Sequence, residues 1–174
     1  MTDPARKIRW RGVGEYRDQA EALLEMAGDV AGVVRGRPRS LLIHCPDGCG
    51  ETLVINLDAR AGKAWRIDTR NDTLSLYPSV WRDDGCKSHF ILWRNHIIWC
   101  GRYEDYNDEP PFDPALLEAV HGELLADEYQ DAASIAERLD EIWWDVSRAL
   151  RLLVRKGQAE EGKGRERQRF RLRR

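Results

Sequence analysis

Two cysteines with a proline and a glycine between them form the sharpest chemical motif of the sequence. The motif occupies residues 45–50 and reads CPDGCG, so three residues separate the thiols of Cys45 and Cys49. Proline and glycine favour a tight turn there, which lets both thiolates face one metal ion. The chain holds 4 cysteines. In a compartment that keeps thiols reduced, such cysteines indicate metal binding before disulfides.

A tetrahedral zinc site needs two further ligands, and the other cysteines are the candidates. Cys86 follows a short acidic turn, and Cys100 ends a predicted strand. His89 competes with Cys100 for the fourth position, because Cys86 and His89 have the ligand spacing C-x2-H. The alternative for Cys100 is a buried, small apolar side chain. The prediction is a structural zinc held by Cys45, Cys49, Cys86 and Cys100, with His89 as the alternative fourth ligand.

Two serines and a histidine lie beside this motif and could carry acyl-transfer chemistry. That chemistry needs a hydroxyl nucleophile within hydrogen-bond reach of a base such as imidazole. In an extended segment Ser88 and His89 point to opposite faces, whereas Ser79 could meet His89 across neighbouring strands. Asp83 and Asp84 are the acidic residues nearest in sequence, but neither is an evident partner for His89. Spacing alone therefore favours a non-catalytic interpretation of these side chains.

The elements that must position these residues read as a β-rich region. A helix is expected at about residues 17–26, followed by short strands between glycine and proline breaks. Trp65, Trp81 and Trp99 are expected to pack in the core. The strands are expected at 30–35, 40–44, 52–57, 73–77, 90–93 and 97–100, with Asn95-His96 as the hairpin turn into the last.

An acidic, proline-rich stretch at residues 104–114 predicts a linker with a domain boundary near Pro110. After it the pattern becomes helical, with Asp113 as N-cap, Asp131 as the cap of a second helix, and Gly157 as the stop of a third. Residues 158–172 read as a β-hairpin with its turn at 162–164. Three helices followed by a hairpin is the order of a winged helix.

The expected fold class is therefore α+β. Residues 1–109 form a small zinc-binding β-rich domain, and residues 110–174 form a winged-helix domain. The chain is 42% hydrophobic and 33% charged, as in globular proteins. It has no apolar run of membrane-spanning length and no apolar stretch after its N-terminal charges, so we expect a cytoplasmic protein without a membrane contact.

Three blocks of the first domain, at residues 36–50, 75–81 and 85–90, together resemble a bacterial domain-of-unknown-function family. Members of that family occur in ubiquitin-like conjugation operons and look like zinc-containing serine peptidases, which mature the ubiquitin-like protein or remove it from its targets. The resemblance covers roughly residues 27–101. It implies zinc ligands and catalytic candidates at these positions: Cys45, Cys49 and Cys86 for zinc, and Ser79, Ser88 and His89 for chemistry. Asp47 stands where some members carry a further cysteine.

The second domain lies outside this resemblance and has two interpretations. Its charge is segregated: residues 101–145 carry 2 Lys/Arg and 14 Asp/Glu, whereas residues 146–174 carry 11 and 3. The third helix of a winged helix enters the major groove of DNA, and the basic end could contact phosphates. The acidic Asp140 and Glu141 at the expected start of that helix oppose this, and an exposed Trp143 or Trp144 would suit a protein partner. The arginines of the basic end are Arg165, Arg167, Arg169, Arg171, Arg173 and Arg174.

Two hypotheses about function follow from these patterns. The first is a serine peptidase that acts on a bacterial ubiquitin-like protein, with the second domain docking that protein or its E1- and E2-like enzymes. The second is a non-enzymatic, zinc-containing winged-helix regulator that binds DNA.

Overall fold

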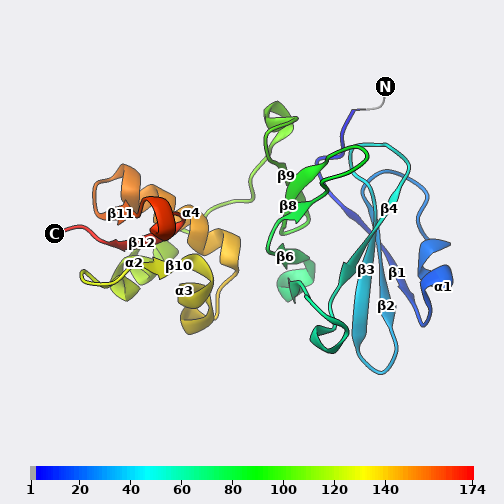
Figure 1. Cartoon of the computed structure of the whole chain (residues 1–174), viewed down its shortest axis with the longest axis horizontal. Helices are drawn as coiled ribbons and strands as arrows, with labels where there is room; N and C mark the ends of the chain where they lie inside the picture. Colours follow the sequence, from blue (N-terminus) through cyan, green and yellow to red (C-terminus); the bar gives the residue numbers. More distant parts are fainter. Residues whose placement is uncertain (1–2) are drawn as a thin grey trace. The chain divides into compact units, whose positions relative to one another are not determined.

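The computed structural model describes residues 3–174, which form two compact units divided between Pro110 and Pro111 (Figure 1). Both units combine helices with strands, which confirms the α+β class. Within residues 3–174, no helix is long and apolar enough to cross a membrane.

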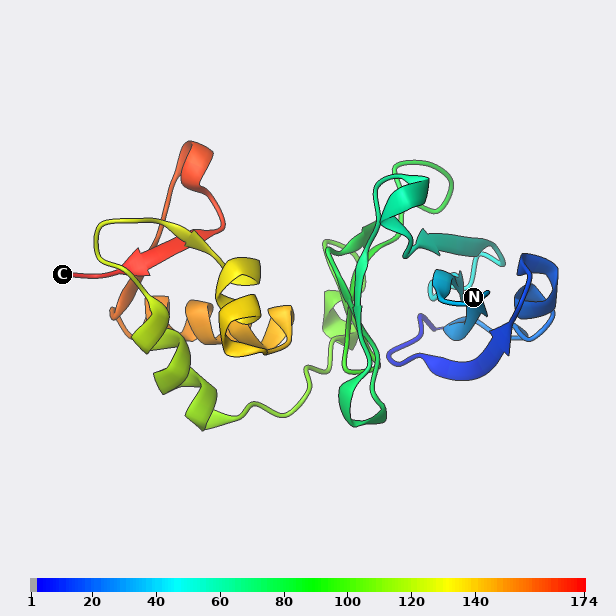
Figure 2. The ribbon, with the colours of Figure 1, turned by 90° about the horizontal axis from the view of Figure 1, so that it is seen from below.

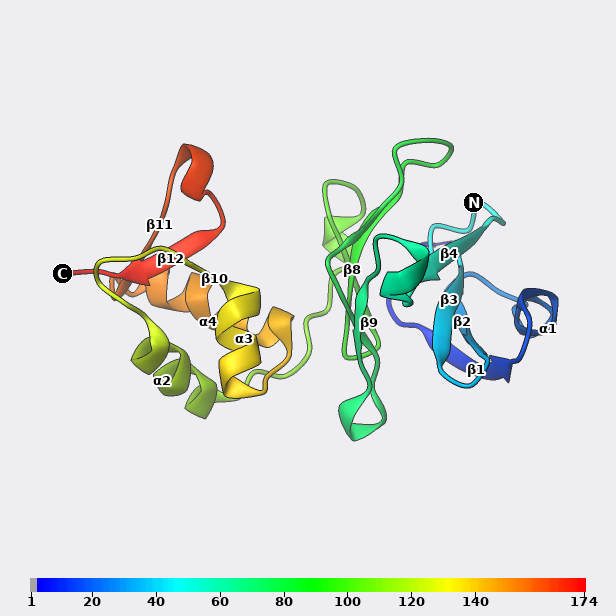
Figure 3. The ribbon, with the colours of Figure 1, turned by 60° about the horizontal axis from the view of Figure 1, so that its bottom comes forward.

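One layer of the first unit is a four-stranded sheet in the order β1-β2-β3-β4, seen side by side in Figure 3. β1 runs parallel to β2, and the other neighbours are antiparallel. The short helix α1 covers part of one face, where Ala20 packs on Ala31, Val33 and Leu42. The bounds are β1 Arg9–Gly14, α1 Arg17–Glu21, β2 Asp29–Val34, β3 Pro38–His44 and β4 Thr52–Asn56.

Strands β2, β3 and β4 confirm the predictions, but the start of the unit differs from them. β1 was not expected, because glycines at positions 12 and 14 interrupt the apolar pattern that would mark a strand. The prediction that α1 reaches Met26 is wrong, since the helix ends at Glu21. The buried carboxylate of Asp29 accepts hydrogen bonds from the backbone N–H groups of Glu25 and Met26. These bonds draw the chain into a turn there.

The second layer of the first unit holds two small antiparallel sheets, β5-β6 and β7-β8-β9. The hairpin between β8 and β9 turns at Arg94-Asn95, where both residues have positive φ. It therefore begins one residue before the expected turn. Phe90, Leu76 and Leu92 from this layer are fully buried with Leu41 and Ile43 of the first layer, forming the main core. The bounds are β5 Arg66–Asp68, β6 Ser75–Tyr77, β7 Val80–Trp81, β8 His89–Trp93 and β9 His96–Trp99, with 3-10 turns at Ala59–Ala61, Arg70–Asp72 and Glu104–Tyr106.

The three tryptophans expected in this core take different positions. Trp99 is buried and packs edge-on against Phe90, as predicted, and Trp65 is half-buried against the core. The prediction is wrong for Trp81, which is 70% exposed. Its neighbour Val80 pairs with Phe90 and points inward, so the alternation of the strand turns Trp81 to the outside.

The second unit runs helix, strand, helix, helix, strand, strand, with its three helices on one side of the red strand β12 in Figure 2. Its sheet has the order β10-β12-β11 and is antiparallel. The bounds are α2 Pro114–Glu123, β10 Gln130–Asp131, α3 Ala132–Leu139, α4 Trp143–Arg155, β11 Ala159–Glu161 and β12 Arg169–Leu172, with a 3-10 turn at Gly164–Glu166.

The predicted helix ends of this unit are confirmed, with two shifts. The carboxylates of Asp113 and Asp131 cap α2 and α3, and Gly157 follows α4 with φ of 72°. Asp140 adopts a left-handed conformation that closes α3, so α4 begins at Trp143 and not at the acidic residues before it. The turn between β11 and β12 is longer than expected and spans residues 162–168.

Candidate functional site

Four side chains of the first unit converge in an arrangement that could hold a metal ion, and we call them the metal-binding group. The ligand atoms of Cys45, Asp47, Cys49 and Cys86 all lie within 4.8 Å of one another. Cys45 follows β3 directly, and its backbone N–H donates to Glu51 O at 2.8 Å, which closes the turn that carries the first three ligands. Cys86 comes from the loop between β7 and β8.

The donor set fits zinc. Thiolates bound at a Zn–S distance of about 2.3 Å lie roughly 3.8 Å apart in a tetrahedral site. The Sγ atoms of Cys45 and Cys86 are 3.7 Å apart, and all four cysteines of the chain are free thiols. Three thiolates and one carboxylate supply four protein ligands.

The charge states of the ligands depend on their surroundings. Burial raises the pKa of the Cys45 thiol, so without a cation this thiol stays neutral. A bound metal ion reverses this by deprotonating the thiols that coordinate it. The pKa of Asp47 is lowered. Burial alone would raise it, but hydrogen bonds from Cys45 and Cys49 to the carboxylate outweigh the effect of burial. The carboxylate is therefore charged and suited to a cation.

The group contains three of the four predicted cysteines and one residue that sequence reasoning did not name as a ligand. Asp47 joins Cys45, Cys49 and Cys86, whereas Cys100 lies outside the group, with its Sγ 3.9 Å from the carbonyl of Ile98. The sequence did contain a signal that Asp47 is a ligand: it lies between two cysteines of the motif, at the position of the further cysteine noted in the sequence resemblance.

An arginine joins the two segments that carry the ligands. Arg82 pairs with Glu51 at 2.6 Å and with Asp84 at 3.0 Å, and its guanidinium lies 3.9 Å from the Sγ of Cys86. Its backbone N–H donates to Ser88 O at 2.9 Å. The turn after β3 and the loop before β8 are therefore held together by the Arg82–Glu51 ion pair as well as by the ligand group.

Ser88 belongs to the surroundings of this metal-binding group. Its side chain is 3% exposed, and its Oγ lies 3.5 Å from the Sγ of Cys45 and 3.4 Å from that of Cys86. It points into the interior, and the following residue, His89, points the other way. A substrate carbonyl has no access to a hydroxyl buried in this manner.

Ser79 and His89 meet on the outer side of the β7-β8-β9 sheet. The Oγ of Ser79 lies 3.1 Å from Nε2 of His89. Trp81 pairs with His89 across the strands, and their rings are 5.8 Å apart. The carbonyl of Ser79 accepts a hydrogen bond of 3.3 Å from the indole N–H of Trp65.

This pair has the geometry that nucleophilic catalysis requires. A neutral imidazole nitrogen at 3.1 Å can accept the hydroxyl proton as the serine oxygen attacks a carbonyl carbon. No carboxylate within residues 3–174 hydrogen-bonds the His89 ring, so Ser79 and His89 form a dyad in the described part of the chain. Trp65 and Trp81, which sequence reasoning assigned only to packing, are the further side chains of this site.

Three of the six arginines named for the basic end pair with carboxylates of the second unit. Arg169 pairs with Glu166, Arg171 with Glu160, and Arg174 with Asp127. The guanidinium of Arg171 also lies over the ring of Tyr129. Two further arginines, Arg165 and Arg167, are exposed in the long turn before β12.

Comparison with known protein families gives a match, which lies within the first unit. Residues 16–100 match the family described as "Bacterial ubiquitination-like system serine protease (BubE)". The matched region contains the metal-binding group and the Ser79–His89 pair, and the match confirms the resemblance found in the sequence. No curated protein and no solved structure matches the chain.

Proposed function

We propose, from the match of residues 16–100 to a serine protease family of a bacterial ubiquitination-like system, that this protein is a serine peptidase. Its substrate is a ubiquitin-like protein, which it matures or removes from targets. The observation that carries the proposal is the distance of 3.1 Å between the Oγ of Ser79 and Nε2 of His89. In this proposal Ser79 is the nucleophile and His89 is the general base.

The reaction follows from that pair. Ser79 Oγ attacks the scissile carbonyl while its proton passes to His89 Nε2, and a tetrahedral intermediate forms. The intermediate collapses as His89 returns the proton to the departing amine, which leaves an acyl ester on Ser79. Water, deprotonated by His89, then attacks the ester and releases the carboxylate product and the free serine.

The metal-binding group has a structural role in this proposal. Cys45, Asp47, Cys49 and Cys86 would together supply the four protein ligands that are typical of a structural zinc site. When bound, zinc would supply a cross-link between the turn after β3 and the loop that leads into β8. His89 is the first residue of β8, so this cross-link supports the strand that carries the base.

The second unit is proposed to be a winged helix that docks a protein partner. Its element order and its sheet order β10-β12-β11 support the winged-helix assignment. DNA binding is the weaker alternative, because Arg169, Arg171 and Arg174 are already paired with carboxylates. A guanidinium in such a pair must lose that partner before it can bind a phosphate.

A cleavage assay tests the peptidase. The substrate is a bacterial ubiquitin-like protein extended at its C-terminus by a reporter peptide. We expect wild type to release the reporter and Ser79→Ala to lose on the order of 10⁴-fold or more in rate, as for other serine nucleophiles. His89→Gln should lose activity similarly, because the amide is not a base.

Two serine variants serve as comparisons, and zinc content is measured for all proteins. Ser147→Ala, in α4 of the second unit, should cleave at the wild-type rate. Ser88→Ala separates the two candidate nucleophiles: cleavage by a zinc-loaded Ser88→Ala protein assigns the nucleophile to Ser79. Full cleavage by Ser79→Ala, or none by zinc-loaded wild type, would refute the proposal.

A further inference from the structure

We propose that the loop between β4 and β5 is a positioning element, which holds Ser79 in reach of His89 through the indole N–H of Trp65. This inference rests on the proposed function, since it concerns the nucleophile of that reaction. The loop spans residues 57–64 and ends at Trp65. Three features support the inference: the way the loop is folded, its attachment to the sheet, and the hydrogen bond from Trp65 to the Ser79 carbonyl.

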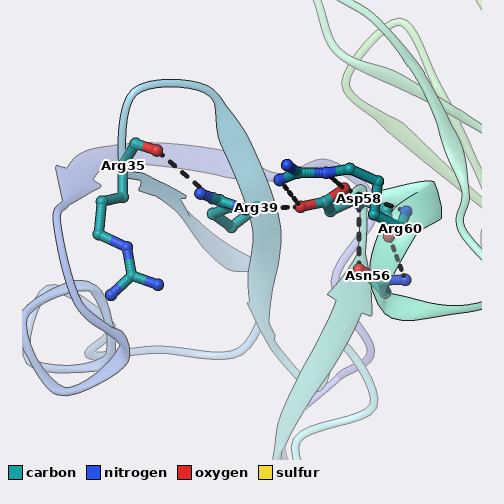
Figure 4. Close-up of polar contacts among 5 residues, drawn as sticks. All are labelled: Arg35, Arg39, Asn56, Asp58 and Arg60. Atoms are coloured by element: carbon teal, nitrogen blue, oxygen red, sulfur yellow. Dashed lines mark hydrogen bonds and ion pairs between the residues drawn. The ribbon is translucent and has the colours of Figure 1, made fainter.

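The side chain of Asn56 folds the loop and brings its two ends together, and Figure 4 shows its contact with Asp58. The amide nitrogen of Asn56 donates to the carbonyls of Asp58 at 3.1 Å and Lys63 at 3.0 Å, and its Oδ1 accepts from Asp58 N at 3.0 Å. The backbone carbonyl of Asn56 accepts from Trp65 N at 2.8 Å. The start of the loop therefore fixes the place of Trp65 at its end.

A buried carboxylate attaches the loop to the first sheet. Asp58 is 9% exposed and accepts from Arg39 of β3 at 2.6 Å and from the Arg60 side chain at 2.9 and 2.7 Å (Figure 4). Charge-assisted bonds of this kind are stronger and more directional than neutral ones. Leu57 N also donates to Arg39 O at 2.9 Å. The loop is thus a rigid extension of the β3-β4 pair.

The end of this extension contacts the backbone of the nucleophile. The Trp65 ring packs on the main core, and its N–H points at Ser79 O, 3.3 Å away. Strand pairing holds the chain on either side of Ser79, since Tyr77 pairs with Arg66 of β5 and Val80 pairs with Phe90 of β8, whereas Pro78 has no N–H to donate. The Trp65 bond acts on the Ser79 carbonyl itself, which lies between these two pairings.

The reaction is sensitive to this position. A displacement of about 1 Å at a reacting group can cost on the order of 10²-fold in rate. Because the Trp65 N–H is engaged with the Ser79 carbonyl, it does not bind the substrate. Loss of this N–H should lower kcat and leave KM unchanged, whereas a substrate-binding residue would change KM.

The test removes the N–H and keeps the ring. In Trp65→Phe the apolar contact largely remains and the donor is lost. Replacing Trp65 by 3-benzothienylalanine keeps the full bicyclic shape and exchanges only the N–H for sulfur, so it remains informative if the phenylalanine variant fails to fold. We expect kcat to fall about 10- to 100-fold, KM to stay within twofold, and zinc content to stay at the wild-type value.

Two further variants complete the design. Asp58→Asn, which weakens the bonds to Arg39 and Arg60, should show the same selective loss of kcat. Trp10→Phe is the matched control, because Trp10 is 52% exposed on β1, in the four-stranded sheet that does not include β7. The rate at which a fluorophosphonate labels Ser79 is measured in parallel, because it reports the reactivity of the serine without the ubiquitin-like substrate.

The outcomes separate this inference from the proposed function. If wild type neither cleaves the precursor nor reacts with the fluorophosphonate, the proposed function has failed. If wild type does both, and both Trp65 variants match it in kcat and labelling rate, the positioning role is overturned and the peptidase stands. A rise in KM at constant kcat would also overturn it, because Trp65 would then be a substrate-binding residue.

Discussion

Substitution of Cys86 by serine is the most direct test of the metal-binding group. Serine keeps the size and the polar contacts to Ser88 but binds zinc far more weakly than a thiolate does. The change leaves Cys45, Asp47 and Cys49, which all come from one turn, so the connection to the β7–β8 loop is lost. The matched control is Cys100→Ser, because the Cys100 thiol lies outside the group.

The expected loss of stability follows from ligand linkage. With free zinc at 100 times its Kd, binding to the folded state alone contributes about 2.7 kcal/mol to the free energy of unfolding. For a domain of about 100 residues each kcal/mol corresponds to roughly 4–8 °C in Tm. The first unit ends at Pro110, so its transition in Cys86→Ser should lie about 10–20 °C below that of the wild type.

Zinc per chain by elemental analysis and scanning calorimetry provide the measurement. Wild type and Cys100→Ser should contain one zinc and melt together, while Cys86→Ser should contain almost none. A chelator should lower the Tm of the wild type to that of Cys86→Ser and leave Cys86→Ser unchanged. Zinc retained by Cys86→Ser would refute Cys86 as a ligand. Zinc lost by Cys100→Ser would return the fourth position to Cys100 in place of Asp47.

Three further predictions concern the outer face of the site, the first sheet and the basic end. Trp81→Ala should raise KM for the precursor about tenfold and leave Tm unchanged, because the ring is exposed beside His89; an unchanged KM would exclude substrate contact. The pKa of the Asp29 carboxyl is lowered. Burial alone would raise it, but hydrogen bonds from the backbone of residues 25 and 26 and from Arg9 outweigh the effect of burial. The stabilisation from this carboxylate is therefore present above about pH 4 and lost as pH falls through the lowered pKa. Urea titrations should show Asp29→Asn to be about 1–3 kcal/mol less stable at pH 7 and closer to wild type at pH 3. By fluorescence anisotropy, the dissociation constant for duplex DNA should be roughly 1 μM or weaker at physiological salt. Nanomolar binding that is lost in a double Arg165→Ala, Arg167→Ala variant would contradict partner docking as the role of the second unit.

The elements that the sequence predicted well are those specified by local chemistry. Asp113 before Pro114 and Asp131 before an apolar run are N-cap patterns, and the structure has helices starting at both. Strands β3 and β4 carry continuous or alternating apolar residues, and the predicted ends of both strands lie within two residues of the ends in the structure. In β1 the glycines at positions 12 and 14 remove the pattern, and pairing with β2 supplies what local preference lacks.

The metal-binding group shows that residue type alone does not predict the full set of ligands. Cysteine is such a strong ligand signal that Cys100 ranked above any carboxylate. The position of a thiol in space depends on strand pairing, however, and Cys100 lies at the end of β9, with its backbone N–H bonded to His89 O. Asp47 needs no pairing to reach the group, because it lies inside the turn that Cys45 and Cys49 define.

The exposure of Trp81 depends on strand pairing in the same way, and it matters most for function. A two-residue strand such as β7 has no periodicity to read, so a tryptophan there is assigned to the core by its size alone. The inward face of β8 can be predicted from the apolar residues Phe90 and Leu92, which the structure shows to be fully buried. Alternation along the strand then places His89 on the outward face. Once Trp81 is paired with His89, alternation directs both side chains to one face and brings Ser79, two residues before Trp81, to the same face. The pairing of β7 with β8 is thus the one long-range fact that converts three separate residues into a candidate active site.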